Sequence, residues 1–524
     1  MAEVIINAVD RNVVKKDLVL SDPNKKKEQM SGASQRIVID TSTSLHITSS
    51  HYLSIAIDSG LIRKKFRGFD FSSKKLQDLA TALSPINIRY GGTYADFLHF
   101  DPNGAESALP KHWDQEKQDL DQTFDSGFFD LPFDKEVANF TMTGRQWDNI
   151  TRFCDKVGWD IMFDFNLFYW RNGYWDPANA DLLLRYSAAR GVKIPSFQLG
   201  NEPNAFFHNF NFSIDGDILV QDFMILKNLI SKYPQYDASG LYGPDVTNLN
   251  RHESSRTYLQ NFLRAGGCDA VTEISVHHYY ANGRTATIKD FMDPTLLDSL
   301  LTNLDFLLNI TMEVCKFHKP FRLTETSSCY GGGAPKLSDA YVAGFMWLDK
   351  LGLSAKYKVT HVFRQTFFGG SYALIDEQLN PTPDYFLSVL YKRLIEGPVF
   401  NVTTAEPNRL LRLYAHCARK GFYNYPDGAL VLYYLNLANQ AINFDFAQYG
   451  NDAVDVFLLT PGDAMGLMSR FVKLNGQPLV MKDSKVPDMP PKHETGDVTV
   501  AAESFGFIVI PSADIELCKR YHRS

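Results

Sequence analysis

Cysteine is scarce in this chain, and long apolar runs are absent. The 524 residues contain 6 cysteines, and no two of them form the CxxC pair that is typical of zinc and redox sites. Because no run of about 18 apolar residues occurs, we expect no membrane-spanning helix. The first residues lack the apolar core of a signal peptide, and residues 1–31 are predicted to form an arm outside the fold.

Several catalytic and nucleotide-binding motifs are also missing. The chain has no GxSxG elbow, no GxGxxG and no GxxxxGK[ST], which argues against an α/β-hydrolase and against the common nucleotide-binding loops. The formal net charge is −7, so the field of the whole protein does not attract a polyanion. We therefore expect no nucleic-acid partner, and any anionic ligand must be held by a local basic cluster.

The composition is that of a folded protein with a normal core. Apolar residues make up 44% and charged residues 22%, and the length suggests more than one domain. Aromatic residues reach 13%, a richness that accompanies carbohydrate-binding surfaces but is equally typical of large buried cores. Five N-x-S/T triplets favour a secreted or lysosomal protein. They begin at Asn139, Asn149, Asn211, Asn309 and Asn401.

Residues 52–394 alternate short β-rich runs with amphipathic helical stretches. Eight such strands predict a closed (β/α)₈ TIM barrel, with a doubly wound open sheet as the alternative. Nearly every strand ends in residues able to do chemistry, which favours the barrel. Residues 101–135 are acidic and turn-rich, and are interpreted as an exposed insertion or a processed loop. The predicted strands are 52–58, 86–92, 160–166, 196–202, 240–246, 274–280, 321–327 and 359–365, and the predicted helices are 74–83, 179–190, 220–233, 255–266, 296–318 and 338–353.

After residue 394 the pattern changes to strands separated by Gly, Pro and Asn turns. Residues 395–524 are therefore predicted to form a C-terminal antiparallel β-sandwich domain without a helix, and segment 32–51 is predicted to add an N-terminal strand to it. Cys417 lies at the end of the first of these strands and Cys518 lies past the last, which predicts a disulfide that closes the sandwich. The predicted strands are 409–417, 428–437, 441–447, 452–460, 470–476 and 503–511.

Two carboxylates have the placement that glycoside hydrolysis needs. Glu202 in QLGNEPN ends the fourth predicted strand, and Glu325 in LTETSS ends the seventh. These strand ends face each other across a barrel mouth, where one carboxyl would protonate the leaving oxygen and the other would attack the anomeric carbon. Asn201 is suited to hold a sugar hydroxyl. The alternative is that NEP marks only a boundary between a strand and a loop.

The segment HHYY at 277–280 raises the question of zinc. Neighbouring histidines on a strand point to opposite faces, and no third ligand is spaced to join them, so we predict no metal site and no cofactor. We expect instead that Tyr279 donates a hydrogen bond to a catalytic carboxylate and that one histidine packs in the core.

Four motifs resemble those of the heparanase family, which comprises endo-β-glucuronidases acting on heparan sulfate. They are LGNEPN, GRTAT, ETSS with YGGGAP, and AGFMWLDKLGLSA, and the similarity runs from about residue 36 to Cys518. The resemblance implies a barrel with a β-sandwich and a retaining, metal-free mechanism, with Glu202 as acid/base and Glu325 as nucleophile. It implies glucuronate contacts for Asp58, Gly331, Gly332 and Tyr372 and sulfate contacts for Arg284. The full set of implied substrate contacts is Asp58, Thr93, Asn201, Tyr279, Arg284, Gly331, Gly332, Gln365, Tyr372 and Arg251.

The chain departs from the family pattern in places that bear on substrate and processing. One basic stretch is thinned to TNLNRHESSR, which leaves Arg251 and Arg256, and the other keeps Lys135 and Arg145. These residues are either weaker sulfate contacts or ordinary solvated surface. The linker that the family excises is shorter and lacks its cysteine, which leaves Cys154 without its expected partner. After such a cleavage the two fragments would associate.

We therefore expect a retaining endo-β-glucuronidase that cuts glucuronic acid–glucosamine linkages in heparan sulfate. Acidic conditions should favour it, because one carboxyl must be protonated while the other is ionised. The alternatives are an exo-β-glucuronidase, an enzyme for a less sulfated glycan, and a non-catalytic heparan sulfate binder resembling the inactive branch of the family. The presence of both Glu202 and Glu325 argues against the binder.

Overall fold

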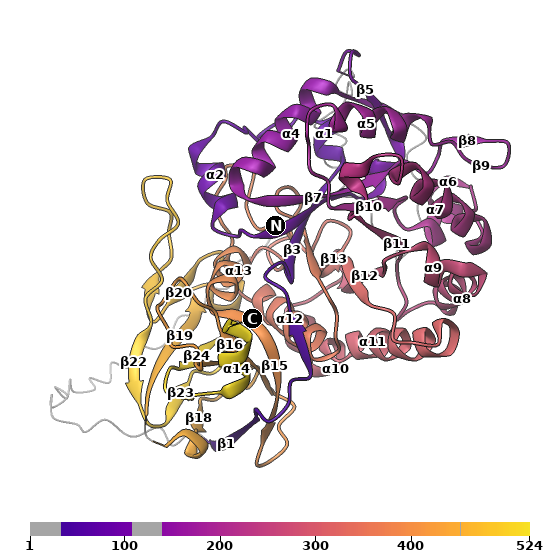
Figure 1. Cartoon of the computed structure of the whole chain (residues 1–524). Helices are drawn as coiled ribbons and strands as arrows, with labels where there is room; N and C mark the ends of the chain where they lie inside the picture. The colour runs from indigo at the N-terminus through magenta and orange to yellow at the C-terminus, as the bar shows by residue number, and fades with distance from the viewer. Residues whose placement is uncertain (1–32, 107–138, 451, 524) are drawn as a thin grey trace, which may run out of the picture.

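The computed structural model describes residues 33–106, 139–450 and 452–523. The predicted N-terminal arm, Lys135 and most of the 101–135 insertion lie outside these residues. The described chain folds into a barrel and a large β-sheet unit that lie against each other (Figure 1). None of the helices in this described part is both long and apolar enough to cross a membrane.

Eight parallel strands close into a barrel in the order in which they follow along the chain. This confirms the (β/α)₈ prediction and excludes the open sheet, whose strand order would reverse at a switch point. Two short pairs, β5 (Leu98–Asp101) with β6 (Phe140–Thr143) and β8 (Trp170–Arg171) with β9 (Tyr174–Trp175), lie outside the barrel. The barrel strands are β3 (Leu53–Asp58), β4 (Ile86–Gly91), β7 (Trp159–Phe165), β10 (Ser196–Leu199), β11 (Gly240–Val246), β12 (Glu273–Asn282), β13 (Phe321–Tyr330) and β14 (Val362–Gln365).

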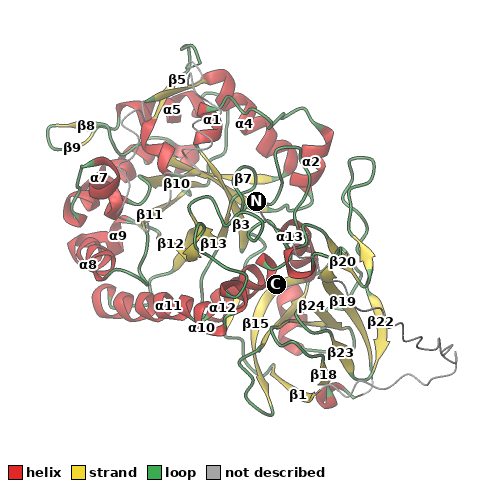
Figure 2. Cartoon of the chain, turned by 180° about the vertical axis from the view of Figure 1, so that it is seen from behind, coloured by secondary structure: helices red, strands yellow, loops and turns green. Residues whose placement is uncertain are grey.

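Helices surround the barrel (Figure 2), and their ends follow local sequence signals. The helix α4 begins with a capping box in which Thr143 and Gln146 satisfy each other's backbone N–H groups, and it ends at Gly158 with φ 74°. The bounds are α1 (Gly60–Arg63), α2 (Lys74–Thr81), α4 (Gly144–Val157), α5 (Ala178–Ala188), α6 (Phe206–Phe210), α7 (Gly216–Ile230), α8 (Glu253–Phe262), α9 (Cys268–Ala270), α10 (Pro294–Leu297), α11 (Ser299–Ile310), α12 (Ala343–Lys356) and α13 (Pro383–Leu394).

The second unit is built on one 12-stranded sheet in which β1 (Ala33–Asp40) pairs antiparallel with β15 and parallel with β18. The N-terminal segment therefore joins this unit. The prediction of no helix was wrong, because the chain ends in α14 (Glu516–Arg523). The other strands are β2 (His46–Thr48), β15 (Ile395–Thr404), β16 (Leu411–Ala418), β17 (Leu430–Asn436), β18 (Ile442–Asp445), β19 (Ala453–Pro461), β20 (Val472–Leu474), β21 (Gln477–Pro478), β22 (Lys492–Thr495), β23 (Val498–Val500) and β24 (Ser504–Ile510).

Most of the aromatic residues belong to the buried cores, so the core interpretation of the composition holds. One core runs continuously from the barrel through α12 and α13 into the sandwich, and a second lies within the sandwich. The second core contains the predicted disulfide between Cys417 and Cys518, whose Cα atoms are 5.4 Å apart. A second disulfide, Cys268–Cys315, was not predicted, and Cys154 is a buried free thiol.

Candidate active site

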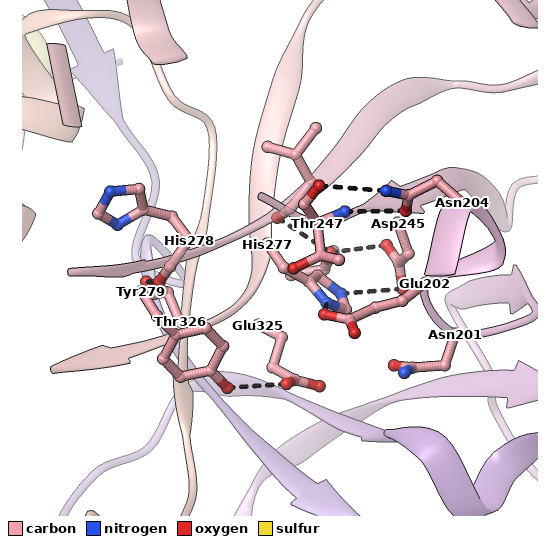
Figure 3. A network of polar contacts seen from close by, with 12 residues as sticks. Asn201, Glu202, Asn204, Asp245, Thr247, His277, His278, Tyr279, Glu325 and Thr326 are labelled. Carbon is pink, nitrogen blue, oxygen red and sulfur yellow. Dashed lines mark hydrogen bonds and ion pairs between the residues drawn. The ribbon is translucent and has the colours of Figure 1, made fainter. Parts of the chain in front are cut away.

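Glu202 lies in the loop after β10 rather than at the end of a strand. The prediction placed it within strand 196–202, but β10 ends at Leu199, and Glu202 has left-handed backbone angles of φ 54° and ψ 53°. Its side chain turns toward the barrel axis, where its Oε1 is 2.8 Å from Nδ1 of His277 (Figure 3). Non-glycine residues rarely adopt this backbone conformation, and such strain clusters at functional sites.

Glu325 lies inside β13, not at its end as predicted, because that strand continues to Tyr330. In the register between β12 and β13, Glu325 is paired with His277. The hydroxyl of Tyr279 donates to Oε1 of Glu325 over 2.7 Å, which confirms the expected hydrogen bond to a carboxylate (Figure 3). Arg89 Nη1 donates to the other oxygen, Oε2, over 2.9 Å. Both oxygens of Glu325 are therefore held by donors.

The two carboxyl groups converge with His277 at the barrel mouth. One oxygen of Glu202, one oxygen of Glu325 and one ring nitrogen of His277 all lie within 4.8 Å of one another. The side chain of Glu202 is 21% exposed and that of Glu325 is 11% exposed, so the pair is accessible yet largely desolvated.

Arg89, which the sequence analysis did not single out, organises the floor of the site. Its side chain is fully buried, and each of its three nitrogens donates a hydrogen bond. The acceptors come from β7, β10, the loop after β10, β11 and β13. They are Asp164, Gln198, Asn201, Asp245 and Glu325.

Asp245 receives more donors than any other carboxylate described at the barrel floor. Its Oδ2 accepts from Arg89 Nη2 over 2.8 Å, and its Oδ1 accepts from Thr324 Oγ1 over 2.7 Å and also from Gln198. Burial alone would raise the pKa of Asp245, but the positive charges of Arg89 and His277 lower it below its ordinary value. Asp245 is therefore ionised although it is only 1% exposed.

The convergence of Glu202, His277 and Glu325 contradicts the argument that no third metal ligand lies near HHYY. The charges around the imidazole nevertheless favour its doubly protonated form. Burial would lower the pKa of His277, but Glu325, Asp245 and Glu202 raise it to about 10. In that form both ring nitrogens carry a proton and neither offers a lone pair to a cation. His278 points to the opposite face and packs in the core, as expected for one of the two histidines.

Comparison with known proteins identifies the family of the chain. Residues 62–352 match the model described as glycosyl hydrolase family 79, N-terminal domain. Heparanase of Rattus norvegicus is 38% identical over 497 residues, which cover 90% of this chain and 91% of the rat protein. The chain is a member of the heparanase family. It is therefore a glycoside hydrolase, in agreement with the sequence analysis.

Other relatives of this chain carry names that record different activities. A protein of Hirudo nipponia named hyaluronoglucuronidase is 29% identical and covers 92% of this chain and 99% of its own length. A human protein named inactive heparanase-2 is 30% identical and covers 92% of this chain and 90% of its own length. Membership of the heparanase family thus leaves the substrate to be argued from the site.

Solved structures support the fold. A 4-O-α-L-rhamnosyl-β-D-glucuronidase from Fusarium oxysporum matches with a TM-score of 0.63 over 91% of this chain and 100% of its own, at 14% identity. A GH51 arabinofuranosidase from Xanthomonas axonopodis pv. citri also has a TM-score of 0.63 and covers 91% of this chain and 99% of its own, at 12% identity. At this identity the match shows the fold of a barrel with a β-sheet unit, and nothing more.

Several substrate contacts implied for a heparanase lie around the carboxylate pair. Asn201 is buried, accepts from Arg89 and donates its backbone N–H to Asp96. Tyr372 stacks on Tyr279 with ring centroids 6.4 Å apart, which places it beside the hydrogen-bond donor to Glu325. Burial and the charge of the nearby Glu325 raise the pKa of Asp58 to about 6.

The remaining contacts implied by resemblance come from loops that follow barrel strands. Gly331 and Gly332 have φ 77° and 80°, and the Gly332 carbonyl accepts from the backbone N–H of Ser371, which joins the loops after β13 and β14. Thr93 begins the turn after β4, and Gln365 ends β14 in a buried position. Their roles toward a substrate stay predictions.

The basic residues singled out from the sequence are mostly engaged within the protein. Arg251 donates to the Tyr280 carbonyl over 2.9 Å and lies over the ring of Tyr330. Arg256 donates to the Leu249 carbonyl over 2.7 Å. Arg145 pairs with Glu106. Arg284 is exposed in the loop after β12.

All five glycosylation triplets begin at described asparagines. Asn149 is partly buried in α4, where its Oδ1 accepts from Arg152. The others are exposed, namely Asn139, Asn211, Asn309 and Asn401. Glycosylation at these positions stays a prediction.

Proposed function

We propose that this protein is a retaining endo-β-glucuronidase that hydrolyses glucuronic acid–glucosamine linkages in heparan sulfate. The observation that carries the proposal is the separation of the carboxyl groups: oxygens of Glu202 and Glu325 lie within 4.8 Å of each other. Retaining glycosidases hold the two groups about 5–5.5 Å apart, whereas inverting enzymes need about 6.5–9.5 Å to admit a water. A separation this short is that of a retaining pair, in which one carboxylate attacks the sugar directly and no water stands between the two groups.

The contacts of each glutamate support its role. Glu325 is held through both oxygens by Tyr279 and Arg89, so its carboxylate is already oriented before the reaction begins. Glu202 is more exposed and pairs through its side chain with His277, which suits a group that must give up and regain a proton.

The proposed reaction has two steps. Glu325 attacks the anomeric carbon while Glu202 transfers its proton to the departing glycosidic oxygen, which forms a glycosyl ester on Glu325 and releases the shortened chain. Glu202 then takes a proton from water, the water oxygen attacks the anomeric carbon, and the ester bond to Glu325 breaks. Two inversions restore the β configuration, and Glu202 ends the cycle protonated, as it began.

The substrate class rests on the relatives and on the loops around the pair. The rat relative named heparanase covers nearly the whole chain, and Arg284 offers an exposed cation at the rim. The two disulfides and the exposed sequons support a secreted or lysosomal location. A second candidate is a less sulfated glucuronic-acid polymer, because Arg251 and Arg256 are bound to backbone carbonyls and a relative is named hyaluronoglucuronidase.

The decisive experiment separates the two glutamates by chemical rescue. We expect Glu325→Ala to lower turnover of an activated aryl β-glucuronide by about 10⁴-fold or more, because it removes the nucleophile. Glu202→Ala should lower turnover as well. Azide should restore turnover in both, giving an α-glucuronyl azide with Glu325→Ala and a β-glucuronyl azide with Glu202→Ala. The exposed Glu406→Gln in the sandwich serves as the matched control and should keep wild-type activity.

The polymer assay then tests substrate and mode of action. Size-exclusion of heparan sulfate after incubation at about pH 5 should show fragments of intermediate size. Release of monosaccharide alone would indicate an exo-enzyme, and cleavage of hyaluronan in preference to heparan sulfate would favour the second candidate. A folded protein that binds heparan sulfate but cuts neither polymer nor the aryl glucuronide would contradict the enzymatic proposal.

A further inference from the structure

The two catalytic glutamates are joined by an unbroken chain of buried charges. Glu325 accepts from Arg89 Nη1 over 2.9 Å, and Arg89 Nη2 donates to Asp245 Oδ2 over 2.8 Å. The same Oδ2 forms an ion pair with His277 Nε2 at 3.4 Å, and His277 Nδ1 is 2.8 Å from Glu202 Oε1. Arg89, Asp245 and His277 are each at most 1% exposed, so water screens this chain little.

We propose that Asp245 is a positioning residue that couples the two glutamates, because its one carboxylate oxygen holds both Arg89 and His277. The inference rests on the roles proposed above for Glu202 and Glu325. Asp245 itself touches no reacting atom. Its negative charge keeps His277 positive beside Glu202 and balances the positive charge of Arg89 beside Glu325.

The backbone shows that the position of Asp245 is built for this contact. Asp245 has φ 54°, the left-handed conformation that only Gly, Asn and Asp adopt with ease. The register between β11 and β12 also shifts between Pro244 and Val246, so the strand bends at this residue. The bend directs the carboxylate toward the barrel axis, where Arg89 and His277 meet it.

The other groups that face Asp245 do not replace it. Its remaining oxygen accepts neutral donors from β10 and β13, and its backbone N–H donates to Ser275 on β12. Among the neighbouring acids, Asp164 and Glu325 already pair with Arg89, and burial raises the pKa of Asp96 to about 7 and that of Asp164 well above its ordinary value. The titratable and charged groups facing Asp245 are Arg89 on β4, Asp96 after β4, Asp164 on β7, His277 on β12 and Glu325 on β13.

The coupling determines whether His277 carries a charge beside Glu202. With Asp245 ionised, His277 stays positive despite its burial, and its Nδ1 lies 2.8 Å from Oε1 of Glu202. Without the Asp245 charge, burial favours a neutral His277, which no longer places a positive charge beside the proposed proton donor.

The test is Asp245→Asn, because Asn keeps the size and tolerates the left-handed backbone. We expect the alkaline limb of the kcat profile to move up by about one pH unit, the lower end of the effect of an opposite charge at this range. We also expect the ¹⁵N resonances of His277, assigned by their loss in His277→Gln, to report a positive ring up to pH 8 in the wild type and a neutral ring at pH 7 in the variant.

Thr324→Val is the matched control. It removes one hydrogen bond to the same carboxylate, from Thr324 Oγ1 at 2.7 Å, and changes no charge. A purely structural role for Asp245 would lower activity in both variants and leave both the alkaline limb and the His277 signal in place, which would overturn the proposal. A neutral His277 in the wild type at pH 7 would overturn it without any variant. The NMR readout does not require turnover, so an inactive protein refutes the proposed function and still tests the coupling.

Discussion

Asp58 is the residue whose ionisation should make substrate binding depend on pH. Desolvation at the end of β3 and the charge of Glu325 raise its pKa to about 6, although Gly60 N–H donates to it over 2.7 Å. Above that pH the ionised carboxyl repels an anionic sugar. If only protonated Asp58 accepts the glucuronate, KM rises about ten-fold between pH 5 and pH 7, as follows from a single titration at about 6.

We expect Asp58→Asn to abolish this rise, so that KM for an aryl glucuronide with a neutral aglycone stays level from pH 5 to pH 7. Asp222→Asn is the matched control, because burial raises the pKa of Asp222 to about 6 as well, but its carboxylate holds the backbone N–H of Trp175. A wild-type KM that does not change over this range, or one that still rises in Asp58→Asn, would contradict the assignment.

At the same scale, the sequence pointed to the two glutamates but not to the residues that organise them. Glu202 and Glu325 stand in motifs that can be recognised locally. Arg89 lies in the strand INIRYG, whose neighbours Ile88 and Tyr90 pack in the outer core. Strand alternation therefore places Arg89 inside the barrel. That signal was present, but its partners come from four other strands and the loop after β10, and no local pattern shows which of them meet.

The disulfide Cys417–Cys518 attaches the C-terminal helix to the sandwich. It links β16 to α14 across a sequence separation of 101 residues, and Cys518 is fully buried in the sandwich core. A bond that closes a loop of this length restricts the unfolded chain strongly. We expect the double variant Cys417→Ser/Cys518→Ser to lose about 2–5 kcal/mol of stability, measured by calorimetry against the oxidised wild type.

Cys154→Ser is the control for that prediction, because it changes a buried thiol that forms no disulfide. Its loss of stability should be the smaller of the two. Equal transition temperatures for oxidised and reduced wild type would refute the stabilising role of the bond. The second disulfide, Cys268–Cys315, was not foreseen because its cysteines lie at the ends of two helical segments, and periodicity does not show which helices are neighbours.

The strands themselves could be predicted well because burial on both faces leaves a continuous apolar signal in a parallel sheet. The predicted 240–246 coincides with β11, and the other barrel strands overlap their predicted ranges. Two strand ends were predicted wrongly, because β10 stops before the NEP motif and β13 continues past Glu325. The end of a strand depends on where its neighbour stops, which the sequence of one strand does not contain.

Across the whole molecule, the barrel and the sandwich share one core, so we expect them to fold as one unit. Nearly all of α12 is buried, since one side packs on the barrel and the other on the sandwich. On the sandwich side, the ring of Phe505 lies 5.0 Å from that of Phe345 in α12 and 4.6 Å from that of Tyr341, which precedes the helix (distances between ring centroids). Tyr391 on α13 likewise meets Tyr433 at 5.7 Å. Removing the sandwich would expose this apolar surface to water.

A chain ending at residue 394 should therefore aggregate or fail to accumulate in soluble form, and the full-length protein should unfold in a single calorimetric transition. Phe505→Ala is the milder version of the same test, because it removes one ring that contacts α12 and should cost about 3–5 kcal/mol. It should lower the transition temperature without splitting the transition, since both units lose the same contact. A soluble, monodisperse 33–394 fragment, or two resolved transitions in the full-length chain, would show that the barrel is stable alone and that the sandwich is an accessory domain.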